Sequence, residues 1–168
     1  MSQTDSDMKI KIFTTGGSID KGYCGISSDF IVLDTRVADL LKDANIDLEV
    51  EIESLLKKDS LEITDEERLM LVDRVKSDPA RLIVISHGTD TLPQTGRALV
   101  GIPGKVIVLT GAVQPAEFKH SDAPFNLGFA MAAVQTLNPG VYLAMNGKIY
   151  DPETVRKNRE RGNYESID

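Results

Sequence analysis

Apolar residues along this chain fall either into short continuous runs or into stripes with helical spacing. Two runs rich in β-branched residues, 82–86 and 105–110, are typical of strands buried on both faces of a parallel sheet. Residues 48–54 instead alternate with a period of two, which indicates a strand with one solvated face near the sheet edge. The other expected strands are residues 9–15, 141–145 and 148–150, the last two joined by a turn at Asn146-Gly147.

The segments between these strands carry helical patterns. Thr64 and Glu67 have the spacing of a capping box in front of an apolar stripe, and Pro79 ends that helix. Further helices are expected over residues 34–44, 91–100 and 126–137. Alternating strands and helices predict an α/β fold, with a doubly wound, mostly parallel sheet flanked by helices in a single domain.

Composition narrows the class of protein. The 168 residues, 41% of them hydrophobic and 27% charged, indicate one globular domain over residues 9–168 after a flexible N-terminal tail, residues 1–8. A net charge of −7 without a basic stripe argues against nucleic-acid binding. The N-terminal residues lack the pattern of a secretory leader, and no apolar run approaches the roughly 20 residues of a membrane span. We therefore expect a cytoplasmic protein that does not associate with membranes.

Candidate chemistry lies in the loops that follow the strands, because ligands of open α/β sheets bind at the carboxyl ends of strands. Residues 14–18 combine hydroxyl groups with a glycine pair, and residues 86–91 add an imidazole and a carboxylate. Either loop alone is more often turn or helix-cap chemistry than a catalytic site. Neither nucleotide-binding glycine pattern is present, and no Ser stands in a G-x-S-x-G turn.

The residues that bind metals are scarce. Cys24 is the only cysteine, so it forms neither an internal disulfide nor a cysteine-based zinc site. His87 follows a buried strand and is expected to be a hydrogen-bonded structural residue, whereas His120 is expected to be solvated. The sequence therefore predicts no metal and no cofactor. A threonine could act as the nucleophile if a lysine or tyrosine accepts its proton, but spacing alone does not pair such groups.

Five ordered segments between residues 9 and 157 resemble the bacterial-type L-asparaginases. The set is much more specific than any one loop because all five occur in the family's order and spacing. They are residues 15–19 (TGGSI), 59–60 (DS), 87–91 (HGTDT), 110–127 (TGAVQP to DAPFNL) and 155–157 (VRK). The resemblance suggests in particular the short, single-domain form of this family.

The resemblance implies a reaction and a role for each catalytic residue. Thr15 would attack the side-chain amide of L-asparagine, and water would release L-aspartate from the acyl-enzyme after ammonia leaves. Tyr23 would assist Thr15. Thr89, Asp90 and Lys157 would form a second triad, and which threonine acts in which step stays open.

It also implies how the substrate is held. Ser60 and the backbone at Gly88 would bind the α-carboxylate, while Asp90 would pair with the α-ammonium group. Backbone groups near Thr89 and Ala112 would stabilise the oxyanion. The family's assemblies imply a homodimer or homotetramer.

Two departures from the family pattern fall on the ammonium side of the pocket. Family members commonly carry a C-terminal domain that sends an acidic residue into a partner's site, and we expect this chain to lack that domain. Leu61 stands where a polar residue commonly follows the substrate serine. Both departures predict weak substrate binding and a comparatively high Michaelis constant.

Two alternatives stay open beside L-asparagine hydrolysis. The chain could be a catalytically weak module that binds an amino acid, or an amidase of a related substrate such as D-asparagine or glutamine. The combination of Thr15, Thr89, Asp90 and Lys157 favours an enzyme, because a binding module has no use for two activated threonines.

Overall fold

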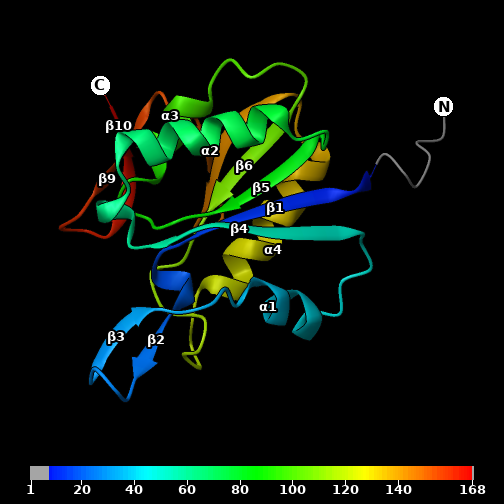
Figure 1. The fold of residues 1–168 in the computed structure, drawn as a ribbon. Coiled ribbons are helices and arrows are strands. Elements are labelled where there is room, and N and C mark those ends of the chain that lie inside the picture. Colours follow the sequence, from blue (N-terminus) through cyan, green and yellow to red (C-terminus); the bar gives the residue numbers. More distant parts are fainter. Residues whose placement is uncertain (1–7, 168) are drawn as a thin grey trace.

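The computed structural model describes residues 8–167, so the predicted tail, residues 1–8, lies outside the described residues except for Met8. Six strands form one sheet in the order β4-β1-β5-β6-β7-β8, in which only β7 and β8 pair antiparallel (Figure 1). These strands are β1 Ile10–Gly16, β4 Val50–Lys58, β5 Leu82–Ser86, β6 Val106–Thr110, β7 Gly140–Met145 and β8 Lys148–Tyr150.

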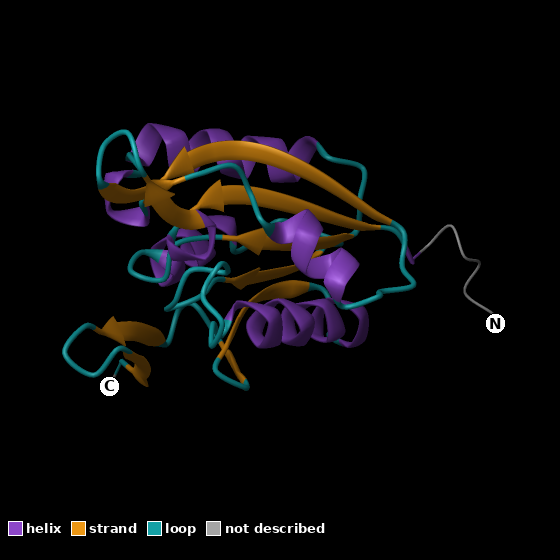
Figure 2. Cartoon of the chain, turned by 90° about the horizontal axis from the view of Figure 1, so that it is seen from below, coloured by secondary structure: helices purple, strands orange, loops and turns teal. Residues whose placement is uncertain are grey.

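Helices cover both faces of this sheet (Figure 2). They are α1 Val37–Asp43, α2 Asp65–Ser77, α3 Leu92–Leu99 and α4 Ala123–Thr136. Side chains alternate along a strand, so Ile12 of β1 packs under α1 and α4, whereas its neighbour Phe13 packs under α2 and α3. The predicted fold class, a mostly parallel α/β sheet with helices on both faces, is confirmed.

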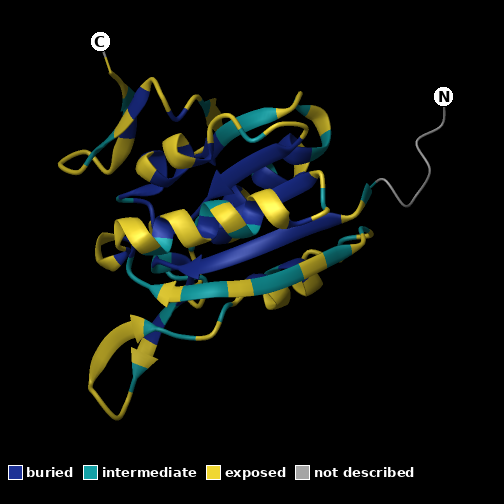
Figure 3. Ribbon diagram, turned by 45° about the horizontal axis from the view of Figure 1, so that its top comes forward, coloured by how far each residue is buried: buried dark blue, intermediate teal, exposed yellow. Residues whose placement is uncertain are grey.

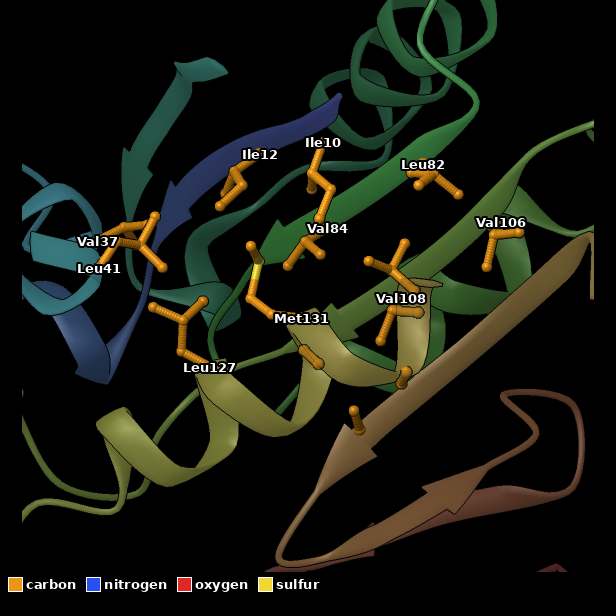
Figure 4. Packing of buried hydrophobic residues seen from close by; sticks show 14 residues of the cluster. Ile10, Ile12, Val37, Leu41, Leu82, Val84, Val106, Val108, Leu127 and Met131 are labelled. Carbon is orange, nitrogen blue, oxygen red and sulfur yellow. The ribbon is translucent and has the colours of Figure 1, made fainter. Parts of the chain in front are cut away.

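The core under α4 shows why the buried strands are so apolar. Figure 4 shows Leu127 and Met131 on the side of α4 that faces Val84 and Val108 of the two central strands, and all four side chains are buried. Burying one such side chain contributes about 1.5–3 kcal/mol. None of the helices within residues 8–167 is long and apolar enough to cross a membrane.

Several local predictions are confirmed, and some boundaries are wrong: α1 begins three residues after the predicted start at residue 34, and β4 extends four residues past the predicted end at residue 54. The Thr64–Glu67 capping box is present, and β4 is an edge strand. Asn146 and Gly147 have φ values of 54° and 75°, as the tight turn between β7 and β8 requires. The predicted helix start at residue 126 is wrong because α4 begins at Ala123 and holds a proline in its first turn, where no N–H is needed.

Two short hairpins were not predicted. The first pairs β2 Lys21–Cys24 with β3 Asp29–Val32, and the second pairs β9 Val155–Asn158 with β10 Asn163–Ser166. The β2–β3 hairpin projects from the body and is largely exposed (Figures 1 and 3). Neither hairpin shows an extended alternation of apolar and polar residues, so pattern alone did not reveal them.

The strand order places the candidate loops together. The chain passes from β1 to β4 on one side and then returns beyond β1 to β5 on the other side. The order therefore reverses between β1 and β5, and the crevice at the carboxyl ends of such a strand pair is where open α/β sheets bind ligands.

Candidate active site

Three loops pack so closely at this point of the sheet that two of their positions, Gly17 and Gly88, have no room for a side chain. A Cβ atom on Gly17 would lie 2.5 Å from the backbone nitrogen of Gly88, and a Cβ on Gly88 would lie 2.5 Å from the Cβ of Ser60. Gly17 also has a φ of 83°, which L side chains rarely adopt. The loops after β1, β4 and β5 are therefore in direct contact, which brings the candidate residues Ser60 and Gly88 together beside the loop of Thr15.

Lys157 reaches this region from strand β9. Its Nζ donates to the Oγ1 of Thr89 (2.5 Å) and to a carboxylate oxygen of Asp90 (2.7 Å). The lysine and aspartate side chains are partly buried, and Arg159 approaches the same carboxylate at 3.9 Å. Residues separated by almost 70 positions thus form one hydroxyl, amine and carboxylate cluster. Such a cluster can move a proton to or from the Thr89 hydroxyl.

Tyr164, on β10, supports the same loop and was missed by the sequence analysis. Its hydroxyl donates to the carbonyl oxygen of Thr89 (2.7 Å), and the residue is only 6% exposed. Burial, with a smaller contribution from Asp90, raises the pKa of this phenol. The signal available in the sequence, one tyrosine in a polar stretch, was too weak to identify it.

His87 is a buried structural residue, as predicted. Its Nδ1 donates to the carbonyl oxygen of Gly88 (2.8 Å), and its Nε2 accepts from the Thr95 hydroxyl (2.8 Å). Thr95 in turn accepts from Nε of Arg68 (3.1 Å). Burial, helped by the nearby Arg68 charge, outweighs the Gly88 hydrogen bond and lowers the pKa of His87 to about 4. The other histidine, His120, is exposed, as expected.

Thr15 lies at the end of β1 with its hydroxyl turned toward the neighbouring strand. That hydroxyl donates to the carbonyl oxygen of Ser86 (3.0 Å), and Thr15 is 0% exposed. The hydroxyls of Thr14 and Ser86, which occupy paired positions on β1 and β5, are buried without a hydrogen-bond partner among the described residues. The carboxyl end of this strand pair is therefore unusually rich in buried hydroxyl groups.

Tyr23 occupies an exposed position on the β2–β3 hairpin. It is 57% exposed and contacts Phe30 edge to face, with ring centroids 5.9 Å apart. Its backbone N–H donates to Glu117 (3.3 Å), and no hydrogen bond within residues 8–167 joins it to Thr15. The expected assistance of Thr15 by Tyr23 stays a prediction.

Ala112 belongs to a loop that side chains at the start of α4 hold in shape. The Asp122 carboxylate accepts from the backbone N–H groups of Val113 and Gln114, both at 2.9 Å. Asn126 donates to the carbonyl oxygen of Gly111 (3.0 Å). These contacts give Asp122 and Asn126 a structural role that their place in the DAPFNL segment did not reveal.

Ser60 is buried in a short 3₁₀ turn, Ser60–Glu62, whose preceding residue caps it. Asp59 accepts from the N–H of Leu61 (3.1 Å) and from Nζ of Lys21 (2.6 Å). Burial alone would raise the pKa of Asp59, but these two hydrogen bonds outweigh it and leave that pKa below its ordinary value. No group of three or more metal-binding side chains is found in residues 8–167.

A cavity opens beside Ser60, between the β2–β3 hairpin and the end of β4. Its volume is about 490 Å³, and its wall includes Lys21, Lys58, Asp59 and Leu61. This volume suits a small ligand. Thr15 and Thr89 are absent from its wall, so this cavity is not the space between the two threonines.

Comparison with known proteins identifies the family. The model of the asparaginase N-terminal domain matches residues 9–164. The L-asparaginase of Thermococcus kodakarensis is 34% identical over 153 residues, which cover 84% of this chain and 45% of that protein. The glutaminase-asparaginase of Acinetobacter glutaminasificans is 38% identical over 104 residues, 56% of this chain and 31% of that protein. The chain belongs to the asparaginase family.

The fold is shared with solved members of the family. The structure of the thermostable L-asparaginase from Thermococcus kodakarensis matches with a TM-score of 0.81 at 31% identity, covering 95% of this chain and 51% of that one. The chain thus spans about half the length of that structure and less than half of each relative named above.

Proposed function

We propose that this protein hydrolyses the side-chain amide of L-asparagine to L-aspartate and ammonia. The observation that carries the proposal is the cluster in which Lys157 contacts both the Thr89 hydroxyl and the Asp90 carboxylate. It lies at the carboxyl ends of the strands, where the Thr15 and Ser60 loops meet. Membership of the asparaginase family and similarity to proteins named L-asparaginase support the same reaction.

The proposed reaction has two steps. The Thr15 Oγ forms a bond to the amide carbon and loses its proton, while the C–N bond breaks and the amine leaves as ammonia after gaining a proton. Water then attacks the resulting ester, restoring the Thr15 hydroxyl and releasing L-aspartate. Thr89 and Lys157 would carry protons in one of these steps, which requires the lysine amine to pass through its neutral form.

Polar groups around the threonines would hold the substrate. Ser60 and the backbone at Gly88 would bind the α-carboxylate, and Asp90 would pair with the α-ammonium group. A hydrogen bond to a charged group contributes about 1.5–3 kcal/mol, enough to favour an α-amino acid over a simple amide. Backbone N–H groups near Thr89 and Ala112 would stabilise the oxyanion.

Glutamine is the second candidate substrate because one relative is named glutaminase-asparaginase. One methylene group changes discrimination by only about 1–3 kcal/mol, so both amides should be tested on the same preparation. We also propose that the protein acts as a homodimer or homotetramer, which light scattering of the purified protein would measure.

The test is ammonia release from millimolar L-asparagine by the purified protein. Thr15→Ala, Thr89→Ala and Lys157→Met should each lower kcat by about 10²–10⁴-fold, the usual contribution of a nucleophile or proton carrier. Lys148→Met is the matched control because Lys148 is an exposed lysine on β8, and its activity should equal that of the parent.

Two results would overturn the proposal. The first is a parent protein that releases no ammonia while asparagine still raises its melting temperature, which would make it a binding module. The second is a Thr15→Ala and a Thr89→Ala variant that both keep full activity, because the hydrolysis would then need neither threonine.

A further inference from the structure

Lys157 has a direct cross-strand partner on its own hairpin. In the antiparallel pair of β9 and β10, Lys157 lies opposite Tyr164. Side chains at directly opposite positions point to the same face of the pair and are close neighbours. Lys157 and Tyr164 therefore extend from the hairpin toward the same part of the molecule.

Both side chains donate hydrogen bonds to Thr89. Lys157 donates to the Thr89 side-chain hydroxyl (2.5 Å), while Tyr164 donates to the Thr89 backbone carbonyl (2.7 Å). Two adjacent side chains of one hairpin thus hold a single residue of the β5–α3 loop at two points. A hairpin attached through Lys157 alone could tilt about that contact, whereas the second contact fixes its distance and orientation.

The Tyr164 ring is well anchored for this role. It packs in the core with Val155, and its centroid lies 5.6 Å from that of Tyr150. Burial raises the pKa of the phenol, so the hydroxyl keeps its proton and remains a donor to the carbonyl across the neutral pH range. Arg97 holds the chain at the start of β9, where its guanidinium donates to the carbonyl oxygens of Pro152 (2.9 Å) and Val155 (3.3 Å).

We propose that Tyr164 is a positioning residue for the amide hydrolysis: its hydroxyl bond to the Thr89 carbonyl keeps the Lys157 amine within reach of the Thr89 hydroxyl. The inference rests on the function proposed above, and it assigns Tyr164 no contact with substrate. Its ring fills the core, and its hydroxyl sets the geometry of the lysine.

Tyr164→Phe tests the inference because it removes the hydroxyl and keeps the ring. We expect kcat for L-asparagine to fall about five- to twentyfold, since one hydrogen bond is lost and a misplaced catalytic group is costly. KM should change less than about twofold, because Ser60 and Gly88, proposed to bind the α-carboxylate, make no hydrogen bond to Tyr164 within residues 8–167. Tyr150→Phe is the matched control: the Tyr150 ring lies tilted against the Tyr164 ring, and no hydrogen bond of the Tyr150 hydroxyl is found within residues 8–167.

A second measurement does not depend on turnover. The acetylation rate of the Lys157 amine by acetic anhydride, followed by mass spectrometry of the folded protein, reports how firmly the amine is held. Tyr164→Phe should raise this rate by at least about threefold, because the amine would leave its partners more often. The Tyr150→Phe rate should match the parent, and melting curves of both variants would confirm that they are folded.

The outcomes separate the inference from the function on which it rests. A lower kcat together with faster labelling supports the positioning role. A Tyr164→Phe variant with parental kcat and parental labelling overturns the inference and leaves the proposed function standing. If the parent releases no ammonia, the proposed function fails, and Tyr164 loses its catalytic role with it; the labelling rates then report only whether Tyr164 holds Lys157 in place.

Discussion

The two threonine regions of the candidate site differ in how far they are assembled. Around Thr89, an amine, a carboxylate and a buried tyrosine already lie at hydrogen-bonding distance. Around Thr15, the hydroxyl bond found within residues 8–167 goes to a backbone carbonyl, and Tyr23 lies on an exposed hairpin. In the first region the proposed proton carriers thus lie at hydrogen-bonding distance from the threonine, while within residues 8–167 the buried Thr15 hydroxyl has no hydrogen bond to a side chain.

This difference follows from what each region rests on. The Thr89 loop follows a fully buried strand. His87 donates a hydrogen bond to the Gly88 carbonyl of this loop, and Tyr164 donates one to the Thr89 carbonyl. The β2–β3 hairpin has few buried residues and is attached to the neighbouring loop through Glu117. Regions with little buried surface are the ones that open and move most readily. If Tyr23 assists Thr15, the hairpin must reorganise when substrate binds.

His87→Gln tests how much the buried imidazole contributes to the Thr89 region. An unfolded histidine binds a proton below about pH 6.5, whereas folded His87 does so only below a pKa of about 4. Between these values the unfolded state binds more protons, so the free energy of unfolding rises with pH, by about 3 kcal/mol across the interval. His87→Gln should lack this part of the pH dependence, measured by denaturant unfolding from pH 4 to 7.

The matched control is His120→Gln, which replaces the exposed histidine and should keep the parental pH dependence. If His87→Gln and the parent lost stability in parallel as the pH falls, carboxylates alone would account for the loss. The imidazole would then not be a support of the Thr89 loop.

Two glycine substitutions compare the packing of the two regions directly. Gly88→Ala would place a methyl group 2.5 Å from the Cβ of Ser60, whereas Gly25, at the tip of the β2–β3 hairpin, has no atom within 4 Å of a Cβ position. We expect Gly88→Ala to lower the free energy of unfolding by about 2 kcal/mol and Gly25→Ala to leave it nearly unchanged. Equal effects in urea unfolding would contradict the difference in packing between the two regions.

Tyr23→Phe should have the smallest of these effects. Loss of one assisting hydroxyl would lower kcat about tenfold, which corresponds to about 1.4 kcal/mol. Tyr142→Phe, which removes a hydroxyl bonded to the Asn138 carbonyl, serves as the control. A Tyr23→Phe variant as slow as Thr15→Ala would mean that the Tyr23 hydroxyl is as necessary as the nucleophile. The Thr15 region would then be as fully assembled in the enzyme–substrate complex as the Thr89 region. An unaffected variant would assign the Thr15 proton to another acceptor.

The sequence was sufficient for the sheet and its helices because their burial imposes regular patterns, as in residues 82–86 and the capped helix after Thr64. It also anticipated the environment of His87 from its place after a buried strand. Lys157 was different, because resemblance alone pointed to it: its strand has no apolar alternation, and its contact with Thr89 spans 68 positions. Tyr164 likewise meets Thr89 through a contact that spans 75 positions, and it was missed for the same reason.

The hairpin that carries Lys157 determines which part of the protein unfolds first in heat or denaturant. It is a two-stranded ribbon outside the main sheet, and isolated ribbons of this kind have little stability of their own. Amide hydrogens of β9 and β10 should therefore exchange with solvent through local opening, long before those of β5 and β6. The lifetime of the Lys157–Thr89 contact in heat or denaturant is then set by the opening of this ribbon, while the sheet beneath it is still intact.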